Sequence, residues 1–367
     1  MESAPFEDSV PVTVLTGFLG SGKTTLLRRA LTAPDFADTA VIINEIGEIA
    51  IDHYLVDFVE GSVLELPGGC LCCAVREDLA ETLRSLFERR DRGEIRQFRR
   101  IVIETSGLAD PAPILFTLAT DPTLDQRLRL GRVATVVDAV TGIATLERFA
   151  EAARQAAVAD ALVISKTDLT PFDEALAARL AALNPGAERI LGSAAADPAR
   201  VLFGASRSPH PLPPPQTGAG EAMGGWGLET HAEAAHTHGI SALTIILEGA
   251  IERLDFARAL GGLAMDRGTD LLRVKGIVRF ADRPEHPAVV QAAQHAMFAP
   301  EWLDAWPDDD RRSRLVFVVH DIGADEILTR FAFASPILIQ DRHPGEGRDP
   351  LFQPARALIG GSRPSPG

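Results

Sequence analysis

The sequence is poor in cysteine and contains no long apolar run. Three cysteines in 367 residues are too few for the disulfide framework of a small secreted domain. No stretch of about 18 consecutive apolar residues occurs, so we expect no membrane-spanning helix. The opening MESAPFEDSV is acidic and lacks the apolar core of a signal peptide, which favours a cytoplasmic protein.

Positive charge is also scarce. The chain has 36 Lys plus Arg against 51 Asp plus Glu, a formal net charge of −15. This balance argues against nucleic acid or an anionic membrane surface as a partner. The lysines are Lys23, Lys166 and Lys275, and every other basic residue is Arg. Against that background a Lys indicates a position that needs a compact ammonium on a flexible stem.

The first half of the chain alternates between apolar runs and helical patterns. Buried strands are predicted at residues 10–16, 40–44, 101–104, 133–139, 161–165 and 188–193. Helical patterns lie between them, for example at 23–31 and 75–90. Strands that alternate with helices indicate a mostly parallel sheet that is covered on both faces. The fold class is therefore α/β over residues 1–203.

The composition changes after this domain. Twelve of the 36 residues in 204–239 are Gly or Pro, which predicts a linker. It ends in a short histidine cluster, His231, His236 and His238. Residues 240–340 show strand and helix patterns of a small α+β domain, and 341–367 are expected to be a disordered tail. Two domains also suit a chain of this length.

A glycine-rich loop follows the first predicted strand. Residues 17–24, GFLGSGKT, match G-x-x-x-x-G-K followed by Ser or Thr, with a strand before and a helix after. Lys23 should reach the β- and γ-phosphates of a nucleotide, and the Thr24 hydroxyl should bind Mg²⁺. We expect the nucleotide to be bound by Gly17, Gly20, Ser21, Gly22, Lys23, Thr24 and Thr25.

Two further strand ends complete this prediction. Glu104 ends a neighbouring strand, where the second Mg²⁺ contact belongs, so Lys23, Thr24 and Glu104 are the candidate catalytic residues. Ser165-Lys166-Thr167-Asp168 follows another strand and is similar to the Asn/Thr-Lys-x-Asp loop of GTPases. There the Asp accepts from guanine N1–H and the exocyclic amine, and the Lys stem lies along the ring. Lys166 and Asp168 therefore favour GTP, although Ser165 is shorter than Asn, which puts one supporting hydrogen bond in question.

All three cysteines lie within GGCLCC, as Cys70, Cys72 and Cys73, directly before a predicted helix. A helix N-terminus favours thiolate, and three adjacent thiolates repel unless a cation neutralises them. Zn²⁺ or Cu⁺ suits such a cluster, and three ligands leave a fourth position open for exchange. A redox pair and simple core packing are the alternatives.

These motifs resemble the CobW-like family of GTP-dependent metal chaperones. GFLGSGKTTLL, INEIGE, GGCLCC, VIETSGLADP, VVDA and SKTDL occur in that family's order, and RVKGIVRF and RLVFVV resemble its C-terminal domain. The resemblance implies slow GTP hydrolysis and delivery of a divalent metal to a client metalloprotein. Zinc is the common cargo, with cobalt or iron as variants. A homodimer is one assembly open to such a protein.

The hypothesis for mechanism is a switch. GTP and Mg²⁺ would order the segment that carries the thiols so that they converge on the metal, and hydrolysis would release it. Two other classes stay open at this stage. One is a small-molecule kinase that uses the same phosphate loop; the other is a non-enzymatic metal buffer or sensor.

Overall fold

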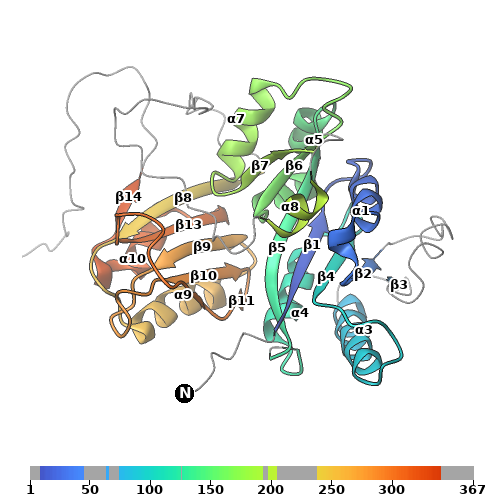
Figure 1. The fold of residues 1–367 in the computed structure, drawn as a ribbon. Coiled ribbons are helices and arrows are strands. Elements are labelled where there is room, and N and C mark those ends of the chain that lie inside the picture. Colours follow the sequence, from blue (N-terminus) through green and yellow to red (C-terminus); the bar gives the residue numbers. More distant parts are fainter. Residues whose placement is uncertain are drawn as a thin grey trace, which may run out of the picture.

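A computed structural model describes residues 9–44, 63–65, 74–124, 126–192, 197–204 and 238–339. Figure 1 shows these residues as two sheets, each with its own helices, that lie side by side. The cysteines at 70, 72 and 73, the linker residues 205–237 and the tail from 340 lie outside the described residues. In the described part of the chain, none of the helices is long and apolar enough to cross a bilayer.

The described part of the N-terminal sheet is wholly parallel, with strand order β3-β2-β4-β1-β5-β6-β7. Its strands are β1 (Val10–Thr16), β2 (Thr39–Asn44), β3 (Val63–Glu65), β4 (Arg100–Thr105), β5 (Leu128–Asp138), β6 (Ala161–Ser165) and β7 (Glu188–Leu191). The accompanying helices are α1 (Lys23–Leu31), η1 (Pro34–Phe36), α3 (Ala74–Asp91), α4 (Ala112–Thr120), α5 (Gly142–Arg148), α6 (Ala150–Ala157), α7 (Glu174–Leu183) and α8 (Pro198–Phe203). This confirms the predicted fold class.

Successive strand residues point to opposite faces of this sheet. Leu15 and Val102 pack with α1, η1 and α8 on one face. Val14 and Ile103 pack on the other face in the largest core, which also holds residues of α3, α4, α6 and α7. Because both faces are covered, the strands are almost continuously apolar, as the sequence pattern indicated.

The C-terminal sheet is antiparallel, with strand order β11-β10-β9-β13-β8-β14, and β12 also pairs with β10. Its strands are β8 (Ile240–Leu247), β9 (Arg273–Val278), β10 (Ala288–Ala293), β11 (Ala296–Met297), β12 (Glu301–Trp302), β13 (Ser313–His320) and β14 (Ile337–Ile339). Helices α9 (Arg253–Arg267), α10 (Ala324–Arg330) and η2 (Ala332–Ala334) complete the domain.

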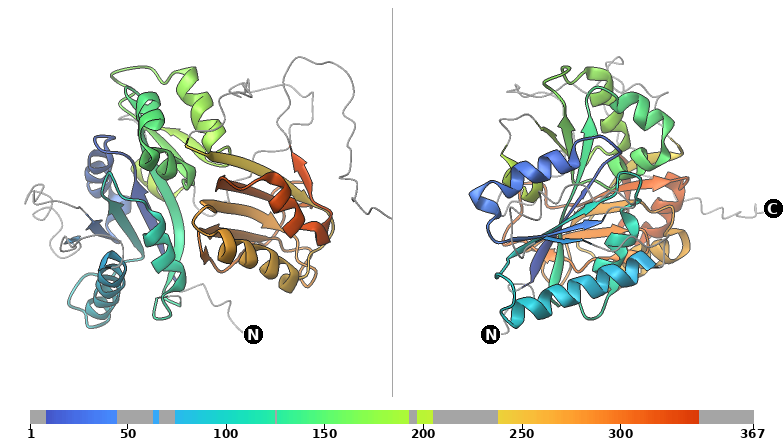
Figure 2. Two further views of the ribbon diagram at one scale, coloured as in Figure 1. Left: turned by 180° about the vertical axis from the view of Figure 1, so that it is seen from behind. Right: turned by 90° about the vertical axis from the view of Figure 1, so that its right-hand side faces the viewer.

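The two faces of the C-terminal sheet have different partners. Along β13, Phe317 and Val319 pack in the core beneath α9 and α10. The intervening Val318 belongs instead to the core of the N-terminal domain, as do Ile240 and Leu272. The C-terminal sheet therefore lies against the helices of the first domain, and Figure 2 shows this contact from behind. The core of the first domain therefore includes apolar residues of the second domain, which also has a core of its own.

A buried ionic cluster joins the domains at this contact. Asp160, just before β6, accepts hydrogen bonds from Arg273 Nη2 (2.9 Å) and Lys275 Nζ (3.1 Å) of β9. Its other carboxylate oxygen accepts from the Val133 backbone N–H (2.9 Å). Burial acts to raise the pKa of Asp160, but the charges of Arg273 and Lys275 outweigh it, so the pKa lies below its ordinary value. Lys275, one of the rare lysines, thus contacts the other domain.

Some short elements departed from the sequence pattern. β5 begins at Leu128, before the predicted 133, and β3, α8 and β14 were not predicted. The unpredicted β3, α8 and β14 hold three to six residues, too few for a clear period of 2 or 3.6. Contacts with neighbouring strands and helices, rather than local pattern, define such elements.

Candidate nucleotide site

The glycine-rich loop connects β1 to α1 at the carboxyl edge of the sheet. Gly17, Gly20 and Gly22 have φ angles of 141°, 71° and 98°, a region that L side chains rarely adopt. A Cβ at Gly17 would lie 2.4 Å from the Val136 carbonyl oxygen. The loop therefore needs glycine for its backbone path, and Gly22 is the N-cap of α1. A backbone cradle at a helix N-terminus fits the phosphates of a nucleotide.

Lys23 is folded over this loop. Its side chain is largely buried, and Nζ donates to the carbonyl oxygens of Gly17 (2.8 Å) and Phe18 (3.4 Å). The ammonium is therefore held within the loop, beside the backbone expected to wrap the phosphates. Thr25, one position beyond Thr24, is exposed on α1.

The two predicted Mg²⁺ ligands lie together. Glu104 pairs with Leu15 across β4 and β1 and is 1% exposed. Its Oε1 accepts a hydrogen bond of 2.8 Å from Thr24 Oγ1. A hydroxyl and a carboxylate in contact beside a phosphate cradle fit Mg²⁺, which prefers oxygen ligands.

The predicted guanine loop is fastened to the phosphate loop. The Ser165 hydroxyl donates to the Ser21 carbonyl oxygen at 2.6 Å. Ser165 therefore does reach the phosphate loop, despite being shorter than Asn. Lys166 has a φ of 57° and donates from Nζ to Asp138 Oδ2 at 2.5 Å. Asp168 is exposed, so its carboxylate is accessible to a base.

Asp138 was not singled out from the sequence as a site residue. It ends β5, and besides Lys166 it accepts from the Val140 backbone N–H (2.7 Å) and Thr141 Oγ1 (3.1 Å). Partial burial acts to raise its pKa, but the hydrogen bond from Lys166 and the backbone bond from Val140 outweigh this, so the pKa is lowered. Asp138 thus positions the Lys166 stem. Glu104 was predicted because it is an acid at the carboxyl end of a strand. The same signal at the end of β5 could have identified Asp138.

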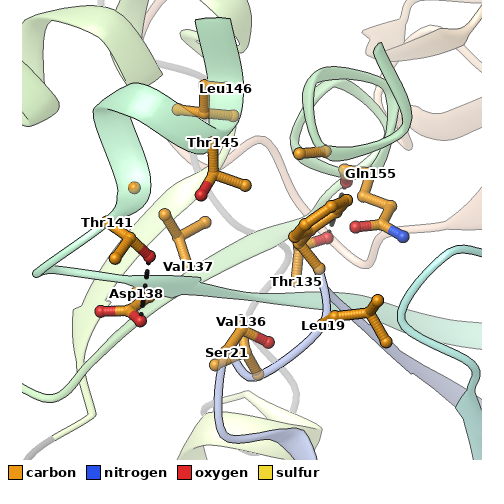
Figure 3. Close-up of a pocket in the computed structure, with 13 residues that line it drawn as sticks. Leu19, Ser21, Thr135, Val136, Val137, Asp138, Thr141, Thr145, Leu146 and Gln155 are labelled. Carbon is orange, nitrogen blue, oxygen red and sulfur yellow. Dashed lines mark hydrogen bonds between the residues drawn. The ribbon is translucent and has the colours of Figure 1, made fainter. Parts of the chain in front are cut away.

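A small pocket lies behind the phosphate loop, between the end of β5 and helices α5 and α6. Figure 3 shows Leu19 and Ser21 of the loop on one side and Thr145 and Leu146 on the other. Ser21 Oγ is buried and has no hydrogen-bond partner among the described residues. The pocket is lined mainly by apolar groups and lies next to the phosphate cradle.

The remaining predicted site residues are the cysteines and histidines of the proposed metal sites. Cys70, Cys72 and Cys73 lie outside the described residues, as do His231 and His236, while His238 is exposed just before β8. Among residues that the structure describes, no group of three or more His, Cys, Asp or Glu side chains could hold a metal ion. The thiol site therefore stays a prediction from the sequence.

A parallel sheet, a phosphate loop and a guanine-type loop define a phosphate-loop GTPase with an attached antiparallel domain. Residues 11–190 match the family model "CobW/HypB/UreG, nucleotide-binding domain", and 240–334 match "Cobalamin synthesis protein cobW C-terminal domain". The chain is 31% identical to the zinc chaperone YjiA of Escherichia coli (strain K12), over 88% of this chain and 98% of the relative. The chain belongs to the CobW family.

Two further comparisons agree with this family membership. The zinc chaperone CobW of Pseudomonas aeruginosa is 42% identical over 35% of each chain. The crystal structure of Zn(II)-bound YjiA GTPase from E. coli has a TM-score of 0.64 and 28% identity, covering 89% of this chain and 99% of that one. The match extends across both domains, so the arrangement of two sheets is common to this chain and YjiA.

Proposed function

We propose that this GTPase is a metallochaperone that binds zinc through Cys70, Cys72 and Cys73 and delivers it to a client metalloprotein. The observation that carries the proposal is the position of the thiol motif in the chain, shortly after strand β3. Strands β1, β3 and β4 are parallel, so their carboxyl ends lie at the edge that holds the phosphate loop and Glu104. Cys70 follows the end of β3, at Glu65, by five residues. Only a short stretch of chain therefore separates the proposed metal ligands from the sheet edge that holds the nucleotide site, so the nucleotide state can influence metal binding.

The names of relatives support the cargo. YjiA and the Pseudomonas CobW are named zinc chaperones, and a Schizosaccharomyces pombe relative is named zinc-regulated GTPase metalloprotein activator 1. Zinc is therefore our first choice, with cobalt as the alternative. The C-terminal domain, whose α9 and α10 face away from the GTPase domain, is the proposed surface for the client.

Each described site residue has a proposed role. Thr24 and Glu104 would hold Mg²⁺, which supplies charge neutralisation at the phosphates. Lys23 offers its ammonium to the β- and γ-phosphates in place of the Gly17 carbonyl. Asp168 accepts from the guanine edge, while Asp138 fixes Lys166 alongside the base. GTP bound this way would favour the thiol geometry that binds metal, and GDP would not.

The first test is whether zinc affinity depends on the nucleotide. Zinc is titrated into the reduced protein against a competing chelator, with Mg²⁺ and either a non-hydrolysable GTP analogue or GDP. Coupling of about 1–3 kcal/mol would make binding roughly 5–150-fold tighter in the GTP-like state. Equal affinities would contradict gated delivery.

Cys72→Ser is the control for the site. It removes a soft ligand, so zinc affinity should fall in both nucleotide states while nucleotide affinity stays near that of the parent protein. If the variant bound zinc as the parent does, the measured zinc would lie elsewhere and the thiol assignment would be wrong.

A further inference from the structure

Gln155 is a buried side chain that the function above does not use. It lies on α6 and is 0% exposed. Its Nε2 donates two hydrogen bonds, to the carbonyl oxygens of Gly107 (3.2 Å) and Ala109 (2.9 Å). Its backbone carbonyl accepts from Thr135 Oγ1 at 2.7 Å, which fixes this point of α6 to β5. Figure 3 shows Gln155 on the side of the pocket where Leu19 lies.

The turn held by Gln155 follows the Mg²⁺ carboxylate directly. Thr105 Oγ1 donates to Thr16 Oγ1 at 2.8 Å, and the Ala109 N–H donates to the Ser106 carbonyl oxygen at 3.1 Å. A Cβ added to Gly107 would lie 2.7 Å from the Leu19 backbone nitrogen. The turn therefore packs directly on the phosphate loop on one side and is tied to α6 by Gln155 on the other.

This placement brings the turn close to where the terminal phosphate of GTP would bind. The turn follows the carboxyl end of β4, directly after Glu104, and packs on Leu19 of the phosphate loop. From there its backbone N–H groups can approach the part of GTP that GDP lacks. Gln155 fixes the carbonyl oxygens of Gly107 and Ala109, so it limits how the peptide units of the turn can rotate. A carboxamide is suited to this because one NH₂ group can donate to two carbonyls.

We propose that Gln155 is a positioning residue that holds the Gly107 turn in the conformation that distinguishes GTP from GDP. The inference rests on the guanine-nucleotide part of the proposed function. Its Oε1 is buried without a hydrogen-bond partner among the described residues. An unpaired buried acceptor is destabilising, so the carboxamide carries a cost at this buried position that an apolar side chain of the same size would not. What Gln155 contributes in return is the two bonds to the turn.

The test compares two apolar replacements of buried carboxamides. Gln155→Met keeps the length of the side chain and removes both donors to the turn. Asn184→Leu is the matched control, because Asn184 Nδ2 donates to the carbonyl oxygens of Ala156 and Ala157, at the end of the same helix, and of Ala159 just beyond it. A general weakening of α6 would therefore affect both variants, and loss of turn geometry would affect Gln155→Met alone.

The measurement is the dissociation constant of the full chain for GDP and for a non-hydrolysable GTP analogue, each with Mg²⁺. Gln155→Met should change the ratio of the two constants by about tenfold against the analogue, from the loss of two hydrogen bonds to one turn. Asn184→Leu should leave the ratio within about twofold. If Gln155→Met does not fold, Gln155→Asn, which keeps the NH₂ group one methylene short, should shift the ratio in the same direction.

Two results would contradict the role proposed for Gln155, and a third would contradict the proposed function. An unchanged ratio in the folded Gln155 variant would make Gln155 a packing residue. An equal change in Asn184→Leu would assign the effect to α6 as a whole. If the parent protein bound neither guanine nucleotide, the proposed function itself would be wrong, and this outcome is separate from the other two.

Discussion

Replacing Asp160 by asparagine is expected to lower the free energy of unfolding by about 3–5 kcal/mol, because it removes one partner of a buried ionic cluster. The amide can still accept from the Val133 N–H, but it carries no charge to balance Arg273 and Lys275. The Lys275 side chain is 26% exposed and can move toward water, whereas that of Arg273 is 4% exposed and cannot. Urea unfolding of the full chain measures the loss.

An exposed ion pair supplies the control for this prediction. Asp282 pairs with Arg253 at 2.6 Å, and both side chains are half exposed. Asp282→Asn should cost at most about 1 kcal/mol, because water screens the pair and solvates what remains. Losses of similar size in the two variants would show that burial at the domain contact does not strengthen the Asp160 cluster.

The same cluster sets a pH dependence. The folded-state pKa of Asp160 is below its ordinary value, so its contribution is complete above that value, about 3.9, and is lost as pH falls toward the folded-state pKa. The difference in stability between the parent protein and Asp160→Asn should be constant above about pH 5 and should narrow below about pH 4. A difference that grew on acidification would contradict the lowered pKa.

Lys23→Ala should reduce the rate of GTP hydrolysis at least about 100-fold, the usual cost of removing one preorganised charge from a transition state. The variant also loses the hydrogen bonds to Gly17 and Phe18, so its stability must be checked alongside. Phosphate release at saturating GTP and Mg²⁺ measures the rate. Arg28→Ala removes a cation from the far end of α1 and should leave turnover within about twofold. If Lys23→Ala hydrolysed GTP at the normal rate, the role proposed for Lys23 and the phosphate loop in hydrolysis would be wrong.

The sequence was informative wherever the chemistry is local. The glycine spacing of residues 17–24 predicted the phosphate loop because positive φ angles and a helix N-cap leave few alternatives to glycine. Alternation of apolar runs and helical patterns predicted the parallel sheet. The Thr24–Glu104 contact could be inferred as well, because carboxyl ends of parallel strands meet at one edge.

The remaining features depend on contacts that no local pattern shows. Asp160 contacts Arg273 and Lys275 across 113 and 115 positions, and no motif or periodic pattern pairs residues so far apart. Gln155 belongs to no motif, and its two acceptors are backbone carbonyls, which leave no trace in residue type. Ser165 was expected to reach less far than Asn, yet close packing of β6 on the phosphate loop brings its hydroxyl to 2.6 Å from the Ser21 carbonyl.

The order in which the ribosome releases the chain matters for the shared core. At about 5–20 residues per second, β9 follows Asp160 out of the ribosome roughly 6–23 seconds later, given their separation of 113 positions. Throughout that interval the GTPase domain has a carboxylate without its two cations, and its apolar surface stays incompletely covered until Leu272 and then Val318 follow. A nascent or prematurely terminated chain is therefore exposed to aggregation and proteolysis at this surface, and completion of β9 and β13 ends that exposure.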